Sequence, residues 1–152
     1  MSSTKIVERK GQKTFEIPKT IFIGPAKGMS FLEKVTITRN ERFSVLFESP
    51  NVRHGPFSST KETQIISSVW SFSEKRLVEK KTVFRRDIEK NYVNGKVEGE
   101  VVQKNWLYSL RSKEMRLSST VSSRYENGVE IGTRVMKDAS GKVIEPWKNS
   151  WA

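Results

Sequence analysis

The sequence predicts an all-β protein, a small antiparallel barrel or sandwich built as a meander of hairpins. Asn94-Gly95 and Asn127-Gly128 each stand between runs in which polar and apolar residues alternate. Asn-Gly is typical of type I′ hairpin turns, because both central residues need positive φ. No stretch shows helical periodicity, and roughly eight to ten short strand-like runs are separated by turn residues, as in sandwiches and barrels.

The N-terminal half contains breaks that suggest short strands. Residues 1–13 are polar and charged, and we expect a flexible basic tail. Pro18 favours an edge strand or a break. Residues 31–38 and 43–47 alternate, which predicts a hairpin that turns at Asn40-Glu41. Residues 49–62 contain two prolines and several serines, and we expect a long loop.

Three cation doublets mark one predicted strand in the middle of the chain. The doublets Lys75-Arg76, Lys80-Lys81 and Arg85-Arg86 put charge on both faces of one strand, so this strand is predicted to be an edge or to have a face open to water. Alternation elsewhere predicts a set of core residues, which comprises Phe43, Trp106, Met115, Leu117 and Val121. The predicted organisation is one β domain over 14–145, followed by a tail over 146–152.

Composition limits the class of partner. The chain has 152 residues, enough for one domain, and its net charge is +11. Such a balance indicates an acidic partner: nucleic acid, an anionic membrane, an acidic protein, or a ligand with carboxylates or phosphates. No apolar run is long enough to span a bilayer and no signal peptide opens the chain, so we expect an intracellular protein without a transmembrane segment.

Catalytic motifs are scarce. Cysteine is absent, which excludes disulfides and thiolate chemistry, and the one histidine, His54, falls in the predicted loop. Glu98 and Glu100 share a strand face and could support acid–base work, but solvated strand carboxylates are far commoner. The sequence contains no phosphate loop, nucleophile elbow or metal-ligand spacing. These observations favour a binding protein without hydrolytic activity.

Arginines form the main candidate site. Arg116, Arg124 and Arg134 occupy polar positions of two adjacent predicted strands, and Arg111 is nearby in sequence. Guanidinium groups form bidentate hydrogen bonds to carboxylates and phosphates, so such a row would bind an anionic ligand. The alternative is a solvent-facing strand on which arginine pairs with Glu126 and Glu130. Trp106 and Tyr125 are the aromatic members of the same candidate site.

The C-terminal third resembles a known family. The relevant segments are Trp106-Leu107-Tyr108-Ser109, Met115-Arg116-Leu117-Ser118-Ser119 and Arg124-Tyr125-Glu126-Asn127-Gly128. They look like the closing strands of the S-type phycobiliprotein lyases and related cyanobacterial calycin-like domains. The resemblance implies a calycin barrel that holds an open-chain tetrapyrrole as its cofactor or cargo, with Arg116 near the bilin propionates, and any enzymatic activity would be bilin lyase-like.

Two functions therefore follow from the sequence. The first is a binding protein for a carboxylated ligand, such as a bilin chaperone or a chromophore lyase-like calycin. The alternative is a structural or assembly protein whose basic face binds nucleic acid or an acidic protein partner. The direction of the cations distinguishes them: into a cavity for the first, outward as a patch for the second.

Overall fold

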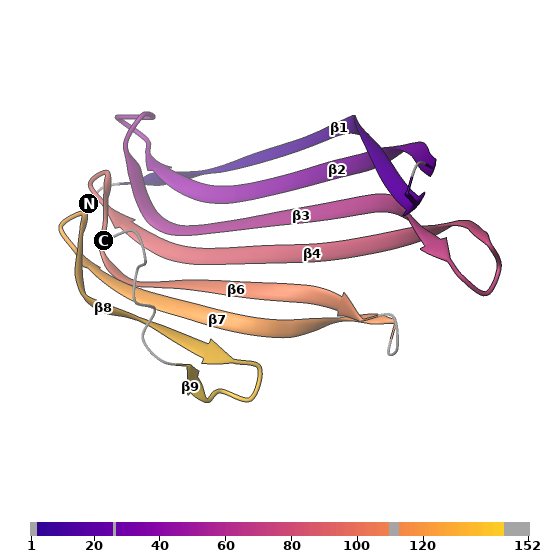
Figure 1. Cartoon of the computed structure of the whole chain (residues 1–152). Coiled ribbons are helices and arrows are strands. Elements are labelled where there is room, and N and C mark those ends of the chain that lie inside the picture. Colours follow the sequence, from indigo (N-terminus) through magenta and orange to yellow (C-terminus); the bar gives the residue numbers. More distant parts are fainter. Residues whose placement is uncertain (1–2, 26, 110–112, 145–152) are drawn as a thin grey trace.

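The protein folds as one open antiparallel sheet whose strands lie side by side in a curved layer (Figure 1). This computed structural model describes residues 3–25, 27–109 and 113–144. The strands are β1 (Thr4–Gly24), β2 (Lys27–Leu46), β3 (Arg53–Ser71), β4 (Arg76–Val93), β5 (Lys96–Val97), β6 (Gly99–Ser109), β7 (Glu114–Glu126), β8 (Val129–Asp138) and β9 (Val143–Ile144). Their order is β1-β2-β3-β4-β6-β7-β8-β9, and β5 pairs with β4.

The predicted all-β hairpin meander is confirmed, but the sheet does not close into a barrel. The two Asn-Gly turns have the expected geometry, with φ of 49° and 85° at Asn94 and Gly95 and of 53° and 84° at Asn127 and Gly128. They join β4 to β5 and β7 to β8. The turn chemistry was readable because it depends only on local residues.

A third turn joins β8 to β9 and is organised by Asp138. Its carboxylate accepts hydrogen bonds from the Ser140 hydroxyl at 2.6 Å, the Ser140 amide at 2.9 Å and the Lys142 amide at 3.0 Å. The hydrogen bond from the Ser140 hydroxyl is the main reason that the pKa of Asp138 lies below its usual value. Gly141 completes the turn with a positive φ of 87°.

The strands of the N-terminal half are longer than predicted. The expected tail is part of β1 from Thr4 onward, and Asn40-Glu41 lies inside β2 rather than at a turn. β3 begins at Arg53, so most of the expected loop over 49–62 is strand. Asn40 pairs with Lys10 on one side and with Thr60 on the other, and this two-sided pairing overrides its weak local preference for strand.

Two predictions about edges have different outcomes. Pro18 does lie in an edge strand, β1. The cation-rich strand β4 is instead internal, between β3 and β6. Its doublets are tolerated because both faces of the single layer reach water, and Lys80 and Lys81 are both exposed. The open face, offered as the alternative to an edge, is therefore what the structure has.

Pairing register assigns each side chain to one of two faces, since residues directly opposite one another point to the same side. Val7, Phe43 and Phe57 are opposite one another, and we name their side the Phe43 face. The other side, which holds Glu8 opposite Arg42, is the Arg42 face. The best-packed cluster lies on the Phe43 face, where Phe43 and Phe57 are 3% and 7% exposed.

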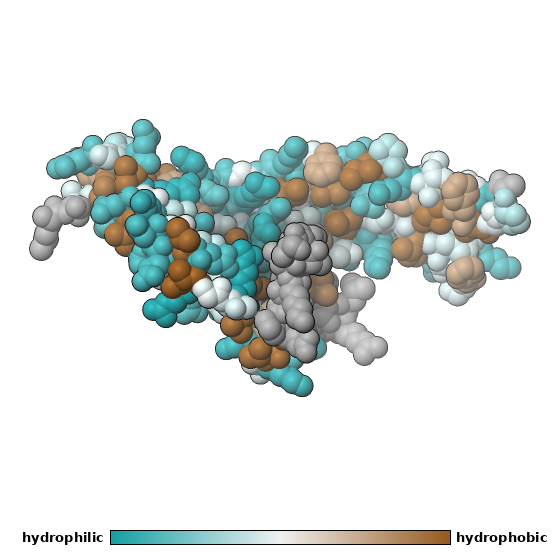
Figure 2. Space-filling model, turned by 60° about the vertical axis from the view of Figure 1, so that its left-hand side comes forward, coloured by the Kyte–Doolittle hydropathy of each residue, from teal (hydrophilic) through white to brown (hydrophobic). Residues whose placement is uncertain are grey.

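The predicted core is only partly confirmed. Phe43 is buried, whereas Trp106, Met115, Leu117 and Val121 are half-buried. The first three lie on the Arg42 face and Val121 lies on the Phe43 face. A single layer has no interior to receive them, and Figure 2 shows hydrophobic side chains at the surface among hydrophilic ones. The tail over 146–152 lies outside the described residues.

Candidate functional site

Charge is distributed unequally between the two faces. On strands β1 to β8 the cations of the Phe43 face are Lys5, Arg9, Lys13, Lys19, Lys27, Arg39, Arg53, Lys61, Arg76, Lys80, Arg86, Lys90, Arg116 and Arg134, and its acids are Glu33, Glu41, Glu114, Glu130 and Asp138. The cations of the Arg42 face are Lys10, Lys34, Arg42, Lys81, Arg85, Lys96, Lys104, Arg124 and Lys137, and its acids are Glu8, Glu16, Glu62, Glu79, Asp87, Glu89, Glu100 and Glu126. Most of the net charge of +11 is therefore carried by the Phe43 face.

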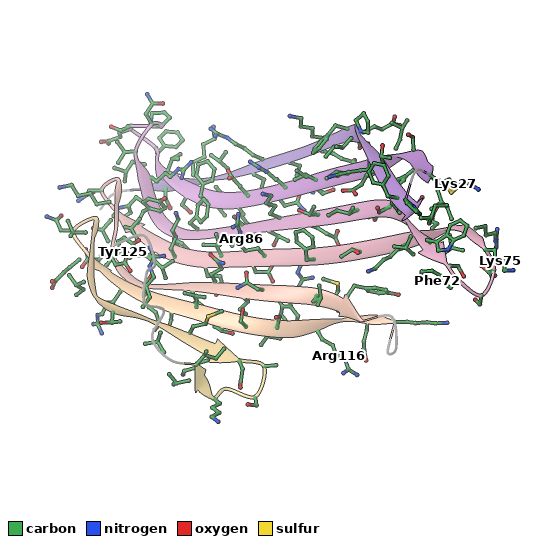
Figure 3. All side chains as sticks on the ribbon, in the orientation of Figure 1. Lys27, Phe72, Lys75, Arg86, Arg116 and Tyr125 are labelled. Atoms are coloured by element: carbon green, nitrogen blue, oxygen red, sulfur yellow. The ribbon has the colours of Figure 1, made fainter. Side chains whose placement is uncertain are left out.

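Three cations form a row across the middle of the Phe43 face. Arg39 is directly opposite Lys61, and Lys61 is directly opposite Arg86. Figure 3 shows Arg86 near the middle of β4. Like charges directly opposite each other destabilise a sheet, so this arrangement costs free energy in the isolated protein. We refer to Arg39, Lys61 and Arg86 as the cation row.

The cation row has no acidic partner among the described residues. The ion pairs within 4.0 Å in this part of the chain are Arg42–Glu8 at 3.7 Å, Arg76–Glu74 at 3.4 Å, Arg85–Asp87 at 3.1 Å and Arg134–Glu130 at 2.7 Å. None of these pairs includes a member of the row. The charges of the row are therefore available to an anion from outside.

A small pocket of about 190 Å³ adjoins the row. It is lined by Lys61, Thr63, Phe84, Arg85, Arg86, Asn105 and Trp106. The Phe84 ring is 41% exposed on the Phe43 face. The Asn105 side chain is held in place, because its oxygen accepts a hydrogen bond from Gln103 at 3.1 Å and its nitrogen donates one to Ser119 at 3.0 Å. The pocket thus combines three cations, an oriented amide and an accessible aromatic ring.

A second cluster on the same face fixes cations over aromatic rings. The Arg53 guanidinium lies 4.5 Å from the ring centre of Phe43, 5.4 Å from that of Phe57 and 5.6 Å from that of Tyr92. The Lys90 ammonium lies 4.8 Å from Phe57, and Arg9 lies 5.2 Å from Phe43. Such contacts hold the charged groups in defined positions at little cost in hydration.

The charges of this cluster act on Tyr92. Burial raises the pKa of the Tyr92 hydroxyl, but hydrogen bonds from Lys90 and Arg53 and the positive charges of both outweigh it. The net result is a pKa below the usual 10.0. The Arg53 hydrogen bond to the phenol oxygen measures 3.3 Å. The tyrosine therefore reports the positive potential of this part of the Phe43 face.

The arginines predicted from the sequence do not form one row. Arg116 and Arg134 lie on the Phe43 face, whereas Arg124 lies on the Arg42 face. A bulge causes the difference: Asn105 pairs with Ser119 and Trp106 pairs with Leu117, so Ser118 is an extra residue and the alternation reverses. Figure 3 shows Arg116 and Tyr125 toward opposite ends of β7. Arg111 lies outside the described residues.

The remaining predicted residues have local partners. Arg134 makes two hydrogen bonds to Glu130, at 2.7 and 3.0 Å, which is the pairing expected for a solvent-facing strand. Tyr125 donates a hydrogen bond of 3.5 Å to the same carboxylate. Trp106 lies on the Arg42 face beneath the Arg85 guanidinium, which is 4.9 Å from its ring centre. His54 accepts a hydrogen bond of 3.1 Å from the Asn94 amide and so supports a turn.

A second, larger hollow is an open groove of about 770 Å³. Its charged lining residues are Arg42, Glu89, Lys90, Glu98 and Glu100. Arg42, Glu89 and Glu100 project from the Arg42 face. Three carboxylates give this groove little attraction for a carboxylated ligand. The cations that would bind such a ligand are exposed on the opposite side of the sheet.

The sequence did not reveal the cation row. Arg39, Lys61 and Arg86 are far apart in the chain, and only the register of β2, β3 and β4 brings them together. The doublet Arg85-Arg86 was the available signal, and it marked one member of the row.

The described ranges contain no group of three or more His, Asp or Glu side chains placed to hold a metal ion, and no helix long and apolar enough to cross a bilayer. Comparisons with protein-family models, curated proteins and solved structures found no match to this chain.

Proposed function

We propose that the Phe43 face binds nucleic acid, with the cation row as its central contact to the phosphate backbone. The observation that carries this proposal is the direct opposition of three cations without a carboxylate within 4.0 Å. Phosphates placed along the row would relieve the repulsion and release condensed counterions. The binding would be tolerant of sequence, since contacts to phosphate carry no base information.

The exposed Phe84 ring favours nucleic acid over an acidic protein. Proteins that bind single strands combine a positive surface with aromatic rings on which bases stack. Phe84 lies two residues from Arg86 on the same face of β4, and it lines the same pocket as Lys61. An acidic peptide would use the charges but would gain little from the ring. A single-stranded nucleic acid would use both.

The test measures binding of a short fluorescent single-stranded RNA by anisotropy at several salt concentrations. The triple variant Arg39→Gln, Lys61→Gln, Arg86→Gln should bind more weakly and lower the slope of log K against log salt by about 2, since each lost phosphate contact removes about 0.7. The matched control is Lys34→Gln, Lys81→Gln, Lys104→Gln, which removes the same charge from the Arg42 face. Its binding should stay close to that of the unmodified protein.

Two outcomes would overturn the proposal. Equal losses in both triple variants would mean that only the net charge matters and that no face is specific. Binding of polyglutamate but not of RNA would identify an acidic protein as the partner. The carboxylated tetrapyrrole predicted from the sequence is tested separately, by visible absorption of the protein after co-expression with a bilin source.

A further inference from the structure

The Arg42 face carries most of the exposed large hydrophobic side chains that can be assigned to a face. Those on the Arg42 face are Ile6, Phe22, Leu32, Val93, Val129, Ile131 and Val143, and those on the Phe43 face are Val69, Phe84, Leu107 and Ile144. Ile6, Phe22 and Leu32 are 56%, 76% and 58% exposed. The Arg42 face is therefore the more apolar of the two in its exposed side chains, and it is the better candidate for contact with another protein.

Few hydrophobic side chains of the described sheet are fully buried, because a single layer has no interior between two packed faces. The buried hydrophobic residues in the described ranges are Val35, Phe43, Val45, Phe57 and Val83. A stable sheet normally packs one face against a second layer. No second layer is formed by the described part of this chain, so both faces of the described sheet are open to contact with another molecule.

Charge identifies a second copy of this chain as the occupant. Cations and acids on the Arg42 face are nearly equal in number and interspersed, as in the pairs Glu8–Arg42 and Arg85–Asp87. Such a face can meet itself across a two-fold axis without net repulsion. The Phe43 face has a large excess of cations and would repel its own copy.

We propose that two copies pack through their Arg42 faces and leave the two Phe43 faces outward. Four strands of 18 to 21 residues cover roughly 1,000 Å², which exceeds the roughly 800 Å² per partner of a stable interface. The open groove lined by Ile6, Pro56 and Val102 supplies a hollow that side chains of the other copy would fill. This dimer is independent of the ligand that the Phe43 face binds.

The oligomeric state in solution tests the dimer, by sedimentation equilibrium over a range of concentrations. The unmodified protein should be a dimer, and Leu32→Asp should weaken dimerisation by about tenfold or more, because it buries an unpaired charge. The matched control is Leu107→Asp, a leucine that is 50% exposed on the Phe43 face. It should leave the dimer intact, and circular dichroism should show strand content in both variants.

A second measurement does not depend on the folding of Leu32→Asp. The chain has no cysteine, so a single cysteine can be placed at Ser58 on the Arg42 face or at Ser59 on the Phe43 face of β3. A bulky maleimide should react slowly at position 58 in concentrated protein and faster after dilution, and it should react at position 59 at one rate throughout. A monomer at every concentration, or protection of position 59 instead, would overturn the proposal.

Discussion

Lys61 on β3 and Arg86 on β4 lie directly opposite each other on one face of the sheet, and neither has a carboxylate within 4.0 Å in the described structure. Arg39 extends the same row on β2. Proteins usually place opposite charges at such positions, because like charges in direct register are destabilising. Under the proposed function, an anion bound along the row would offset this loss of stability.

Lys61→Gln should change stability and binding in opposite directions. Removing the central charge of the row should raise the free energy of unfolding by about 0.2–1 kcal/mol at low salt and should weaken RNA binding. Lys104→Gln is the control, because Lys104 lies opposite Asp87 and its loss removes a favourable neighbour. Urea titrations of both variants check the prediction, and a destabilised Lys61→Gln protein would contradict it.

The two Asn-Gly turns were predictable from the sequence, whereas the faces of the C-terminal strands were not. Asn127-Gly128 has a local requirement for positive φ, which two residues reveal. The bulge at Ser118 leaves no such mark, and one extra residue moved Met115 and Leu117 to the face opposite Val121. A period-two pattern therefore predicted strands correctly and side-chain directions incorrectly.

Strand length was also hidden from sequence reasoning. Asn40 and Glu41 have low intrinsic preference for strand, yet they lie within a strand of 20 residues because both neighbours pair with them. The candidate site depends on this continuity. Had β2 turned at Asn40, Arg39 would not have lain opposite Lys61.

Tyr92 should titrate below pH 10. Its pKa is lowered by Lys90 and Arg53 despite burial, so between the folded pKa and 10.0 the unfolded state holds more protons than the folded state. The contribution of Tyr92 to stability should thus rise with pH through this window. Ultraviolet difference spectra between the unmodified protein and Tyr92→Phe isolate its titration, and a midpoint above pH 10 would show that burial outweighs the cations.

The Glu130–Arg134 pair should stabilise the fold only above acidic pH. The hydrogen bond from Arg134 is the main reason that the pKa of Glu130 lies below its usual 4.5. A depressed pKa contributes stability that is present above 4.5 and is lost as pH falls through the folded value. Because the pair is exposed, the effect should be at most about 1 kcal/mol.

Glu130→Gln measures this contribution. The difference in Tm between the unmodified protein and the variant should be positive at neutral pH and should disappear in acid. Arg134→Lys should lose part of the same difference, because lysine cannot form both hydrogen bonds that Arg134 makes to Glu130. A difference that persists unchanged at pH values well below 4.5 would assign the stability to packing instead.

Phe84→Ala should weaken binding of single-stranded RNA more than binding of a polyanion without bases. The ring is 41% exposed and lies in the pocket that Lys61 and Arg86 also line, so a base stacked on it would be held while its phosphate meets the cations. Stacking of one base contributes about 1–3 kcal/mol.

Leu107→Ala is the matched control, since Leu107 is directly opposite Phe84 and 50% exposed. Anisotropy competition with RNA and with polyphosphate separates the two contributions: Phe84→Ala should lose affinity for RNA alone, and Leu107→Ala should lose little for either. An equal loss for RNA and polyphosphate in Phe84→Ala would mean that the ring shapes the cation row and does not contact a base.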